Sequence, residues 1–217
     1  MKHIYCILIS GLIIISSHAQ TKIQGISPYL FPEFTQGVIL MKGGEKNETL
    51  LNYNSLTEEM IFENNGKQMA ISQRDFARID TVYIKDRKFI PSIDLFVETI
   101  YDSKWDLLVE HKCDMKQPGK PAGYGGTTET TAVTSYSSFS AGGMAYQLKL
   151  PEGYETRSYF YYWLRRDGKL NKFMSMRELK KLFKDKEDLI KPYVKEYNVK
   201  YDNQESIIQL IEYLETN

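Results

Sequence analysis

Short apolar runs alternate with turn residues between Gln36 and Asp114, and a new run starts about every ten residues. This spacing is typical of short antiparallel strands joined by tight turns. The Asn65-Gly66 pair favours a type I′ hairpin, because both central residues of that turn need a positive φ angle. The runs that we assign to strands are Val38–Met41, Leu50–Tyr53, Met60–Phe62, Met69–Ile71, Ile79–Ile84, Ile93–Tyr101 and Trp105–Cys113.

The last of these runs shows the clearest alternation of apolar and polar residues. One face of the strand would carry Trp105, Leu107, Val109, His111 and Cys113. The other face would carry Asp106, Glu110, Lys112 and Asp114, with Leu108 as the exception. We therefore expect one buried face and one solvated face.

Residues 117–143 differ from the rest of the chain, because glycine, serine and threonine dominate and only Lys120 and Glu129 are charged. A segment of this length without a clear element is usually functional or disordered. We expect a mobile insertion here, with a loose edge hairpin as the alternative, since threonine favours strands. Two more strands should follow, an alternating one over 144–150 and one over 158–164 that is apolar or aromatic on both faces.

From Ser175 onward the apolar residues follow the period of a helix. Ser175 and Glu178 form a capping box at the start of a first helix. A second helix, from about Lys186 to Tyr197, is either kinked at Pro192 or begins near Asp188, so that the proline falls in its first turn. For a third helix, Asp202 and Glu205 are the expected capping residues. Each helix has an apolar stripe that should pack on the sheet or on the other helices.

These patterns together predict an α+β fold. An antiparallel β-meander, or a partly closed barrel or sandwich, would be followed by three C-terminal α-helices packed on it. Residues 20–35 would form an irregular lead-in. Residues 36–217 would form a single domain, β-rich over 36–166 with a flexible loop at 117–143, and helical over 175–215.

Residues 1–19 have the pattern of a signal peptide. Lys2 gives a positive start, residues 4–15 are mostly apolar, and Ser17 and Ala19 place small residues before a cleavage point. The apolar run is too short to cross a bilayer as a helix. We expect cleavage between Ala19 and Gln20, and a mature protein without a transmembrane segment that is exported to the periplasm, the cell surface or the exterior.

Charge and histidine content narrow the possible chemistry. The 28 basic residues balance the 28 acidic ones, which gives no sign of a nucleic-acid partner. After removal of the signal peptide, His111 and Cys113 would be the only histidine and cysteine. Zinc sites and nucleophilic mechanisms depend on histidine and cysteine residues. We expect His111 and Cys113 to lie on the apolar face of a strand, where a buried thiol is unreactive. The sequence predicts no catalytic residue, no metal site and no cofactor.

Paired carboxylates need no sequence signature, so a hydrolase of the glycosidase type stays open as an alternative. Glu58 and Glu59 come just before a strand and have the character of solvated turn charges.

The aromatic residues are the remaining candidates for a site. Tyr159, Tyr161 and Trp163 share one face of the 158–164 strand, and Tyr124 lies in the glycine-rich segment. Because tyrosine and tryptophan rings contact sugars and peptides well, these four are the candidate ligand-binding residues. The alternative, which the sequence favours for the strand, is that both of its faces belong to the core.

Several segments together resemble an uncharacterised family of small exported proteins of Gram-negative bacteria. They are the signal peptide, the LLNYN–EEM–F–NGK hairpin region, the KPAGYGGT loop, the EGY–YYW strand and the leucine-rich lysine helices. The resemblance implies an exported protein with a β-rich body and a helical C-terminus. It implies no activity and no site residues.

These observations predict a non-enzymatic periplasmic or cell-envelope protein. It would bind an envelope protein or a polar ligand through residues 117–143 and the adjoining edge of the sheet. One alternative is an envelope hydrolase that uses paired carboxylates. The other is a structural subunit of an envelope assembly, whose 117–143 segment becomes ordered on the sheet edge of a partner.

Overall fold

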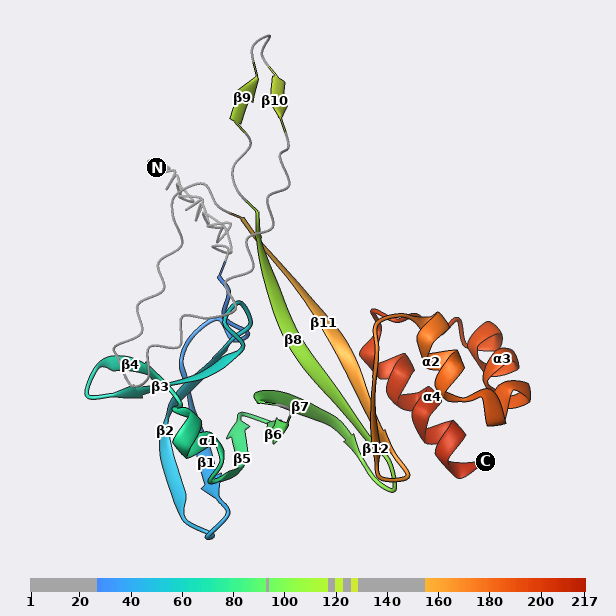
Figure 1. Ribbon diagram of the computed structural model, residues 1–217, viewed down its shortest axis with the longest axis horizontal. Coiled ribbons are helices and arrows are strands. Elements are labelled where there is room, and N and C mark those ends of the chain that lie inside the picture. The colour runs from blue at the N-terminus through green and yellow to red at the C-terminus, as the bar shows by residue number, and fades with distance from the viewer. Residues whose placement is uncertain (1–26, 93, 117–119, 123–125, 129–154) are drawn as a thin grey trace, which may run out of the picture.

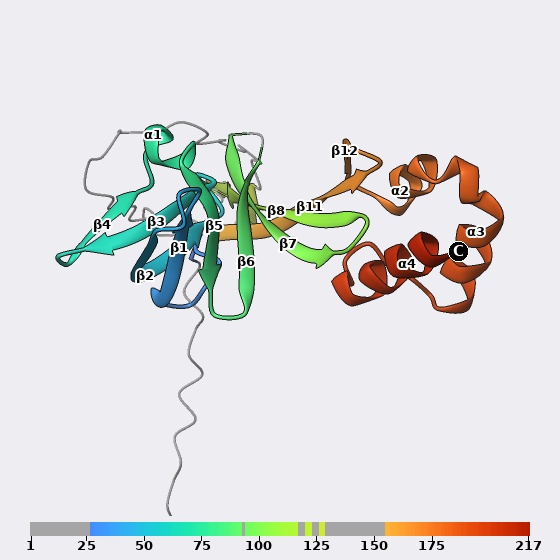
Figure 2. The same cartoon turned by 90° about the horizontal axis from the view of Figure 1, so that it is seen from below.

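A ten-stranded antiparallel sheet and a group of C-terminal helices make up the α+β fold of this chain. The computed structural model describes residues 27–92, 94–116, 120–122, 126–128 and 155–217. In Figures 1 and 2 most of the sheet lies on one side and the helices lie on the other, with the long strands between them. The predicted order, an antiparallel sheet followed by helices, is confirmed.

The strands of the sheet are β1 (Thr35–Met41), β2 (Lys46–Asn54), β3 (Glu59–Asn64), β4 (Lys67–Ala70), β5 (Ile79–Ile84), β6 (Arg87–Ser92), β7 (Leu95–Asp102), β8 (Asp106–Lys116), β11 (Glu155–Arg166) and β12 (Lys169–Phe173). Their order is β12-β11-β8-β7-β6-β5-β1-β2-β3-β4, so the sheet is open and ends at β12 and β4. The long pairing between β8 and β11 connects the two sides of the molecule.

Two hairpins have the same turn geometry. The predicted Asn65-Gly66 turn joins β3 to β4 with φ angles of 52° and 74°. Asp167-Gly168 joins β11 to β12 with the same two values. Both pairs satisfy the positive φ angles of a type I′ turn.

Some elements were not predicted by the apolar pattern. Strand β6 (RKFIPS) starts with two cations and contains a proline, and β12 (KLNKF) is half polar. The short helix α1 (Gln73–Phe76) begins after Ser72, whose hydroxyl accepts the Asp75 amide. Inside the segment 117–143, for which a loose edge hairpin was the alternative prediction, β9 (Lys120–Ala122) and β10 (Gly126–Thr128) pair as a two-stranded antiparallel sheet separate from the main one.

Other predictions fall on parts of the chain that the structure does not describe. The signal peptide, the 144–150 strand and the remainder of the 117–143 segment lie outside the described residues. Of the lead-in, residues 27–34 are described, and they run without regular structure apart from a single bridge between Tyr29 and Asn54.

The C-terminal helices are α2 (Met176–Leu182), α3 (Glu187–Glu196) and α4 (Gln204–Thr216), with a 3₁₀ turn at Lys184–Lys186. Ser175 caps α2 as predicted, since its hydroxyl accepts the Glu178 amide at 3.3 Å. The capping prediction for α4 was wrong: the residue that caps it is Asn203, whose Oδ1 accepts the Ser206 amide at 3.0 Å. Helix α3 begins at Glu187, so Pro192 lies inside the helix rather than in its first turn.

Two large hydrophobic cores and one small cluster, formed by Leu56, Cys113 and Met115, lie along the sheet. The first fills the space between the strands β8, β11 and β12 and the helices, with Leu107, Val109, Tyr162, Phe173, Leu179, Phe183, Ile190, Ile207, Leu210, Ile211 and Leu214 among its buried members. The second lies against β1–β7 and includes Phe31, Ile39, Leu51, Tyr53, Met60, Ile79, Val82, Ile84, Phe89 and Phe96.

Strand β8 follows the predicted alternation on one face only. The face with Leu107, Val109, His111 and Cys113 is buried, as expected. The opposite face is not uniformly solvated, because Glu110 is only 3% exposed. Side chains from β11 and β12 cover this carboxylate and supply its hydrogen bonds, which the pattern within β8 alone does not reveal.

Candidate functional site

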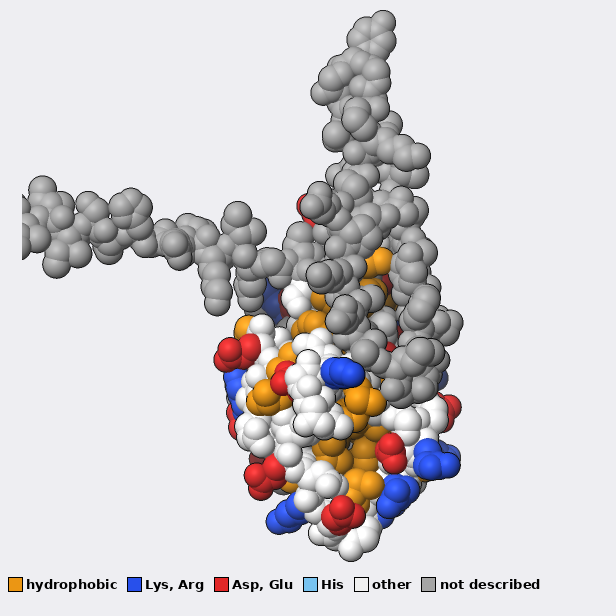
Figure 3. Space-filling model, turned by 90° about the vertical axis from the view of Figure 1, so that its left-hand side faces the viewer, with side chains coloured by type: hydrophobic (Ala, Val, Ile, Leu, Met, Phe, Trp, Pro, Cys, Tyr) orange, Lys and Arg blue, Asp and Glu red, His pale blue; other side chains and the backbone are white. Residues whose placement is uncertain are grey.

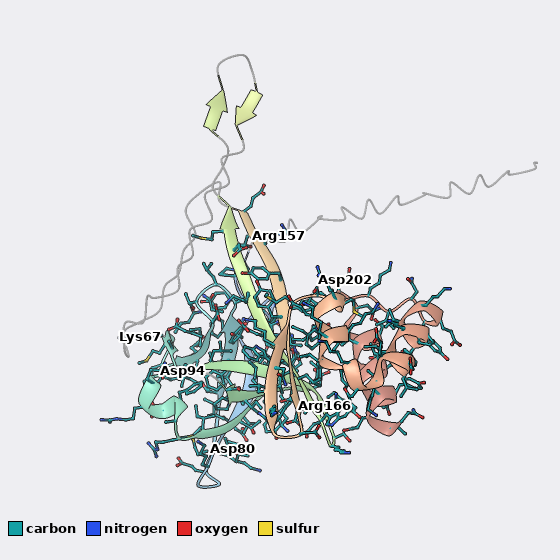
Figure 4. The ribbon with its side chains drawn as sticks, turned by 45° about the vertical axis from the view of Figure 1, so that its right-hand side comes forward. Lys67, Asp80, Asp94, Arg157, Arg166 and Asp202 are labelled. Carbon is teal, nitrogen blue, oxygen red and sulfur yellow. The ribbon has the colours of Figure 1, made fainter. Side chains whose placement is uncertain are left out.

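Three of the four predicted ligand-binding residues lie side by side on one face of β11. Tyr159, Tyr161 and Trp163 alternate with Phe160 and Tyr162, whose rings pack in the core under the helices. The rings of Tyr159 and Tyr161 are 5.4 Å apart at an interplanar angle of 68°. All three side chains are half-buried, so they are neither fully exposed nor part of a sealed core. Figure 4 marks the two ends of β11 with the labels Arg157 and Arg166.

The fourth predicted residue, Tyr124, lies outside the described residues. The structure therefore brings together Tyr159, Tyr161 and Trp163 and leaves the contribution of Tyr124 as a prediction.

A lysine and a buried carboxylate organise these rings. Lys172 Nζ in β12 lies 4.2 Å from the ring centre of Tyr161 and 5.1 Å from that of Trp163. The same ammonium donates to Glu110 Oε2 at 2.7 Å, and Trp163 Nε1 donates to that oxygen at 2.7 Å. We call Tyr159, Tyr161, Trp163, Lys172, Glu110 and Asp114 the aromatic face.

Burial and hydrogen bonds shift the pKa values of Glu110 and Tyr159 in the aromatic face. Burial alone would raise the pKa of Glu110, but hydrogen bonds from Lys172 and Trp163 outweigh it and hold the pKa below its usual value. Burial and the neighbouring Asp114 raise the pKa of Tyr159, whose hydroxyl donates to Asp114 Oδ1 at 3.1 Å. The face thus presents a carboxylate, an ammonium group and a neutral phenol in set positions.

A second salt bridge extends this network toward the β2–β3 turn. Lys112 Nζ donates to Glu58 Oε1 at 2.5 Å and to Glu110 Oε1 at 3.3 Å. Burial would lower the pKa of Lys112, but the two carboxylates outweigh it and raise it. Glu58 is therefore an ion-pair partner, not the solvated turn charge that the sequence indicated.

A buried polar cluster occupies the opposite face of β8. Arg87 binds the Glu98 carboxylate through two nitrogens, and Glu98 Oε2 lies 2.6 Å from His111 Nε2. Arg87 Nη2 also lies 3.0 Å from His111 Nε2. These side-chain partners lie on two other strands, β6 and β7. We call Arg87, Glu98 and His111 the buried triad.

Tyr53 packs beside this triad. Its ring lies 6.4 Å from the ring of His111 and 6.1 Å from that of Phe89. Its hydroxyl is buried without a hydrogen-bond partner. Burial raises the pKa of Tyr53 well above its usual value, as do the carboxylates of Glu58 and Glu110.

The geometry at His111 and Cys113 gives no activated nucleophile. Burial raises the pKa of the Cys113 thiol, whose sulfur donates to the Asp114 carbonyl at 3.6 Å. Burial also lowers the pKa of His111, against the opposing effect of Glu98. A nucleophilic cysteine needs an accessible thiolate, and Cys113 is 6% exposed.

In the part of the chain that the structure describes, no three or more His, Cys, Asp or Glu residues gather in a way that could hold a metal ion. In the same residues, no helix has both the length and the apolar character that crossing a bilayer requires.

A cavity of about 450 Å³ opens at the end of β1, β2 and β3 beside α1. Its apolar lining comes from Ile39, Met41, Phe62, Ile71 and Ile79. Four acidic residues also border it, but strand register places the side chains of Glu48 and Glu63 on the opposite face of the sheet from Ile39 and Phe62. Figure 3, which views the molecule from the β4 side, shows hydrophobic side chains in the middle of this face with charges around them.

No family model, curated protein or solved structure matches this chain.

Sequence reasoning missed Lys172 as a member of the site, although a signal for it exists. A two-residue turn at Asp167-Gly168 sets the register that places Lys172 directly opposite Trp163. Glu110 lies opposite Tyr161 in the pairing of β8 with β11. Because residues 117–154 separate these two strands in the chain, no local pattern gives that register.

Proposed function

We propose that this chain is a non-enzymatic binding module of the cell envelope that engages a partner protein through its aromatic face. The observation that carries the proposal is the set of half-buried rings on β11, held in place by Lys172 and Glu110. Tyrosine and tryptophan are the side chains that contribute most to protein interfaces. Here their orientation is fixed before binding, which reduces the entropy lost on association.

A protein partner suits this face better than a flat stacking ligand such as a sugar. Tyr159 and Tyr161 meet at 68°, so their rings do not form a common plane. Lys172 also lies over the rings of Tyr161 and Trp163. A partner that inserts side chains between the rings, and that bears charges to match Lys172 and Asp114, makes use of both features.

The alternative of a carboxylate hydrolase has weaker support. A glycosidase needs two carboxyl groups that face a common substrate. Glu58 and Glu110 are instead bound to lysine side chains, Lys112 in both cases and Lys172 for Glu110. The alternative of a structural subunit depends on residues 117–143, most of which lie outside the described residues.

Export forms part of the proposal and rests on the sequence of residues 1–19. Lys2, the apolar run after it and the small residues Ser17 and Ala19 support cleavage before Gln20. Expression of the full chain in a Gram-negative host, followed by mass spectrometry of the envelope fraction, tests this. A mature chain that begins at Gln20 is the expected product, and an uncleaved cytoplasmic chain would contradict export.

Photo-crosslinking tests the binding surface. A benzoylphenylalanine at position 161 should give a discrete cross-linked product with one envelope protein, because that side chain sits in the centre of the aromatic face. Position 83 is a matched control, since Tyr83 is a 39% exposed tyrosine of the same sheet that lies in β5, away from β11. The product from position 161 should disappear in Lys172→Glu. Identical products from both positions, or a product unaffected by Lys172→Glu, would refute the proposal.

A further inference from the structure

Over residues 155–161, strand β11 has a neighbouring strand on one side only. It pairs with β8 over almost its whole length, but β12 ends at Phe173, which lies opposite Tyr162. Residues 155–161 therefore form an open edge of the main sheet within the described part of the chain. Two rings of the aromatic face, Tyr159 and Tyr161, belong to this stretch.

The hairpin register shows which main-chain groups of β11 point toward this open edge. The two-residue turn at Asp167-Gly168 makes Arg166 and Lys169 a hydrogen-bonded pair. Because bonded pairs alternate along an antiparallel ladder, the even-numbered residues of β11 direct their amides and carbonyls to the β12 side, and the odd-numbered residues direct theirs to β8. The pairings of β11 with β12 and β8 contain no register shift, so this alternation holds back to residue 155.

The even-numbered residues of the open edge are Thr156, Ser158 and Phe160. The Phe160 carbonyl accepts the Tyr201 hydroxyl at 3.0 Å, which agrees with its direction away from β8. Within the described residues, the amides and carbonyls of Thr156 and Ser158 have no hydrogen-bond partner. Unpaired main-chain groups along a sheet edge are a template for an added strand.

A cation without a carboxylate partner lies beside the open edge. Arg157, labelled in Figure 4, is exposed and shares a face of β11 with Tyr159. Its cross-strand neighbour Asp114 accepts the Tyr159 hydroxyl at 3.1 Å, and Arg157 forms no salt bridge with any described residue. Glu155, on the same face, lies opposite Lys116 in the register. An exposed guanidinium of this kind favours an acidic segment next to it.

The far end of the sheet offers fewer contacts to an added strand. The edge strand there is β4, which has only four residues, Lys67–Ala70, and none of them is aromatic. The open edge of β11 instead combines unpaired main-chain groups with rings and a cation on one face.

We propose that the partner protein adds an extended acidic segment as a strand along residues 155–161 of β11. Main-chain hydrogen bonds to Thr156 and Ser158 supply affinity, as in other complexes formed by strand addition. A carboxylate of the segment pairs with Arg157, and the next side chain on that face contacts the ring of Tyr159. This inference rests on the function proposed for the aromatic face and specifies the form in which the partner binds there.

Photo-crosslinking from position 161 tests the strand pairing in the envelope. Ser158→Pro removes an outward amide, and its ring blocks an added strand, so the cross-linked product should decrease at least about fivefold, the size of one hydrogen bond. Proline is tolerated at an edge where the lost amide faces solvent. Ser158→Ala keeps the amide and should give an unchanged product. Unfolding curves show whether each variant is folded.

Amide exchange of the unmodified protein, measured residue by residue with NMR, detects the pairing without any substitution. The probe is a short peptide of alternating threonine and glutamate, and the control peptide has lysine in place of glutamate. At millimolar concentration the acidic peptide should slow exchange at Thr156 and Ser158 at least about fivefold. The amides of Arg157 and Tyr159, which point to β8, should be unaffected. The basic peptide should have no effect, and Arg157→Glu should reverse this preference.

The two measurements separate this inference from the function on which it rests. A product at position 161 that requires Lys172 but is unchanged in Ser158→Pro would overturn the strand pairing and leave the aromatic face as the binding surface. The absence of any product at position 161 would refute the proposed function itself.

The exchange data have two further outcomes that would overturn the inference. Equal protection of Thr156 and Ser158 by the acidic and the basic peptide would exclude an acidic partner segment. Slow exchange at both residues in the protein without peptide would show that another part of this chain already covers the edge.

Discussion

Protonation of His111 would change the net charge of the buried triad. The imidazole meets Glu98 from β7, Arg87 from β6 and the ring of Tyr53 from β2. Burial lowers its pKa from the usual 6.5, Glu98 opposes this, and Arg87 adds to it. In the folded protein at neutral pH the ring is therefore neutral, and the bidentate pair of Arg87 with Glu98 balances its own charge.

This arrangement predicts a loss of stability in mild acid. An unfolded chain binds a proton at His111 near pH 6.5, whereas the folded chain does so only at lower pH. The contribution of this group is therefore complete above about pH 6.5 and is lost as the pH falls through the folded pKa, at no more than about 1.4 kcal/mol per pH unit. Urea denaturation at pH 7.5, 6.5 and 5.5 should show the decline in the free energy of unfolding.

The His111→Gln variant provides the comparison for this prediction. The two chains differ only at position 111, so the difference between their pH profiles isolates His111. The variant should be less stable at pH 7.5 and should lose less stability between pH 7.5 and 5.5. Parallel profiles for the two chains would contradict the assignment.

The sequence predicts whether a side chain is buried where the alternation within a single strand determines it. The alternation in β8 correctly places Val109, His111 and Cys113 on a buried face. The partners of His111 could not be predicted, because Arg87 and Glu98 come from two other strands whose register the pattern does not define. Glu110 shows the same limit, since its burial results from side chains of β11 and β12.

At the scale of the elements, strand β1 is closely packed at one glycine. It lies between β5 and β2, and Gly37 pairs with Ile84 on one side and with Thr49 on the other. A Cβ atom at Gly37 would lie 2.5 Å from the Tyr83 carbonyl oxygen and 2.7 Å from Leu51 Cδ1. Because one of these atoms belongs to the backbone of a paired strand, it cannot move away without loss of sheet hydrogen bonds.

Gly37→Ala is therefore expected to destabilise the protein by at least about 1–3 kcal/mol, as overpacked cores do. Gly43→Ala is the matched control, because a Cβ atom there has nothing within 4 Å. Thermal unfolding followed by circular dichroism should show a clear decrease in Tm for the first variant and almost none for the second. Similar values for the two would mean that β1 does not have this packing.

Two substitutions can show which residue caps the N-terminus of helix α4, Asn203 or Asp202. Asn203 caps the helix in the structure, whereas the sequence pattern assigned this role to Asp202. Asn203→Ala should cost about 1 kcal/mol of stability, since the Ser206 amide loses its acceptor. Asp202→Ala should have an effect close to zero in the same denaturation experiment, and the reverse ranking would restore Asp202 as the cap.

Element type was predictable wherever the local signal was strong. The Asn65-Gly66 turn and the Ser175 cap both appear in the structure. The other half of the predicted capping box differs, because the Glu178 carboxylate accepts the amide of Met174 instead of that of Ser175. Strands β6 and β12 were missed because charged, polar and proline residues interrupt their apolar pattern. The Asp167-Gly168 turn was available as a signal for β12 and would also have placed Lys172 beside the aromatic residues.

At the scale of the whole molecule, the helices are attached to the sheet by a few polar contacts in addition to their core. Glu215 of α4 accepts the Trp105 amide at 2.5 Å and the Tyr101 hydroxyl at 2.6 Å. Arg166 donates to the Leu182 carbonyl at 3.1 Å, and its guanidinium lies over the rings of Trp105 and Phe183. Figure 4 shows Arg166 at the end of β11 beside the helices.

Removal of the Glu215 charge should loosen this attachment. Glu215→Gln is expected to cost about 1–2 kcal/mol, because two charge-assisted hydrogen bonds become weaker. Amide exchange should become faster in α4 and stay unchanged in β1–β5, whose buried residues belong to the other core. Glu212→Gln serves as the control on the same helix. Equal acceleration throughout the chain would show that the two cores unfold as one unit.

Strand β8 pairs with β7 over its first residues and with β11 over nearly its whole length. Leu107 and Val109 belong to the core under the helices, whereas Cys113 and Met115 pack on Leu56. Strand β8 therefore contributes to the packing of both the sheet side and the helix side of the molecule. If recombination replaced one side with a foreign segment, β8 would lose part of its packing. We expect the two sides to be inherited together and not as exchangeable modules.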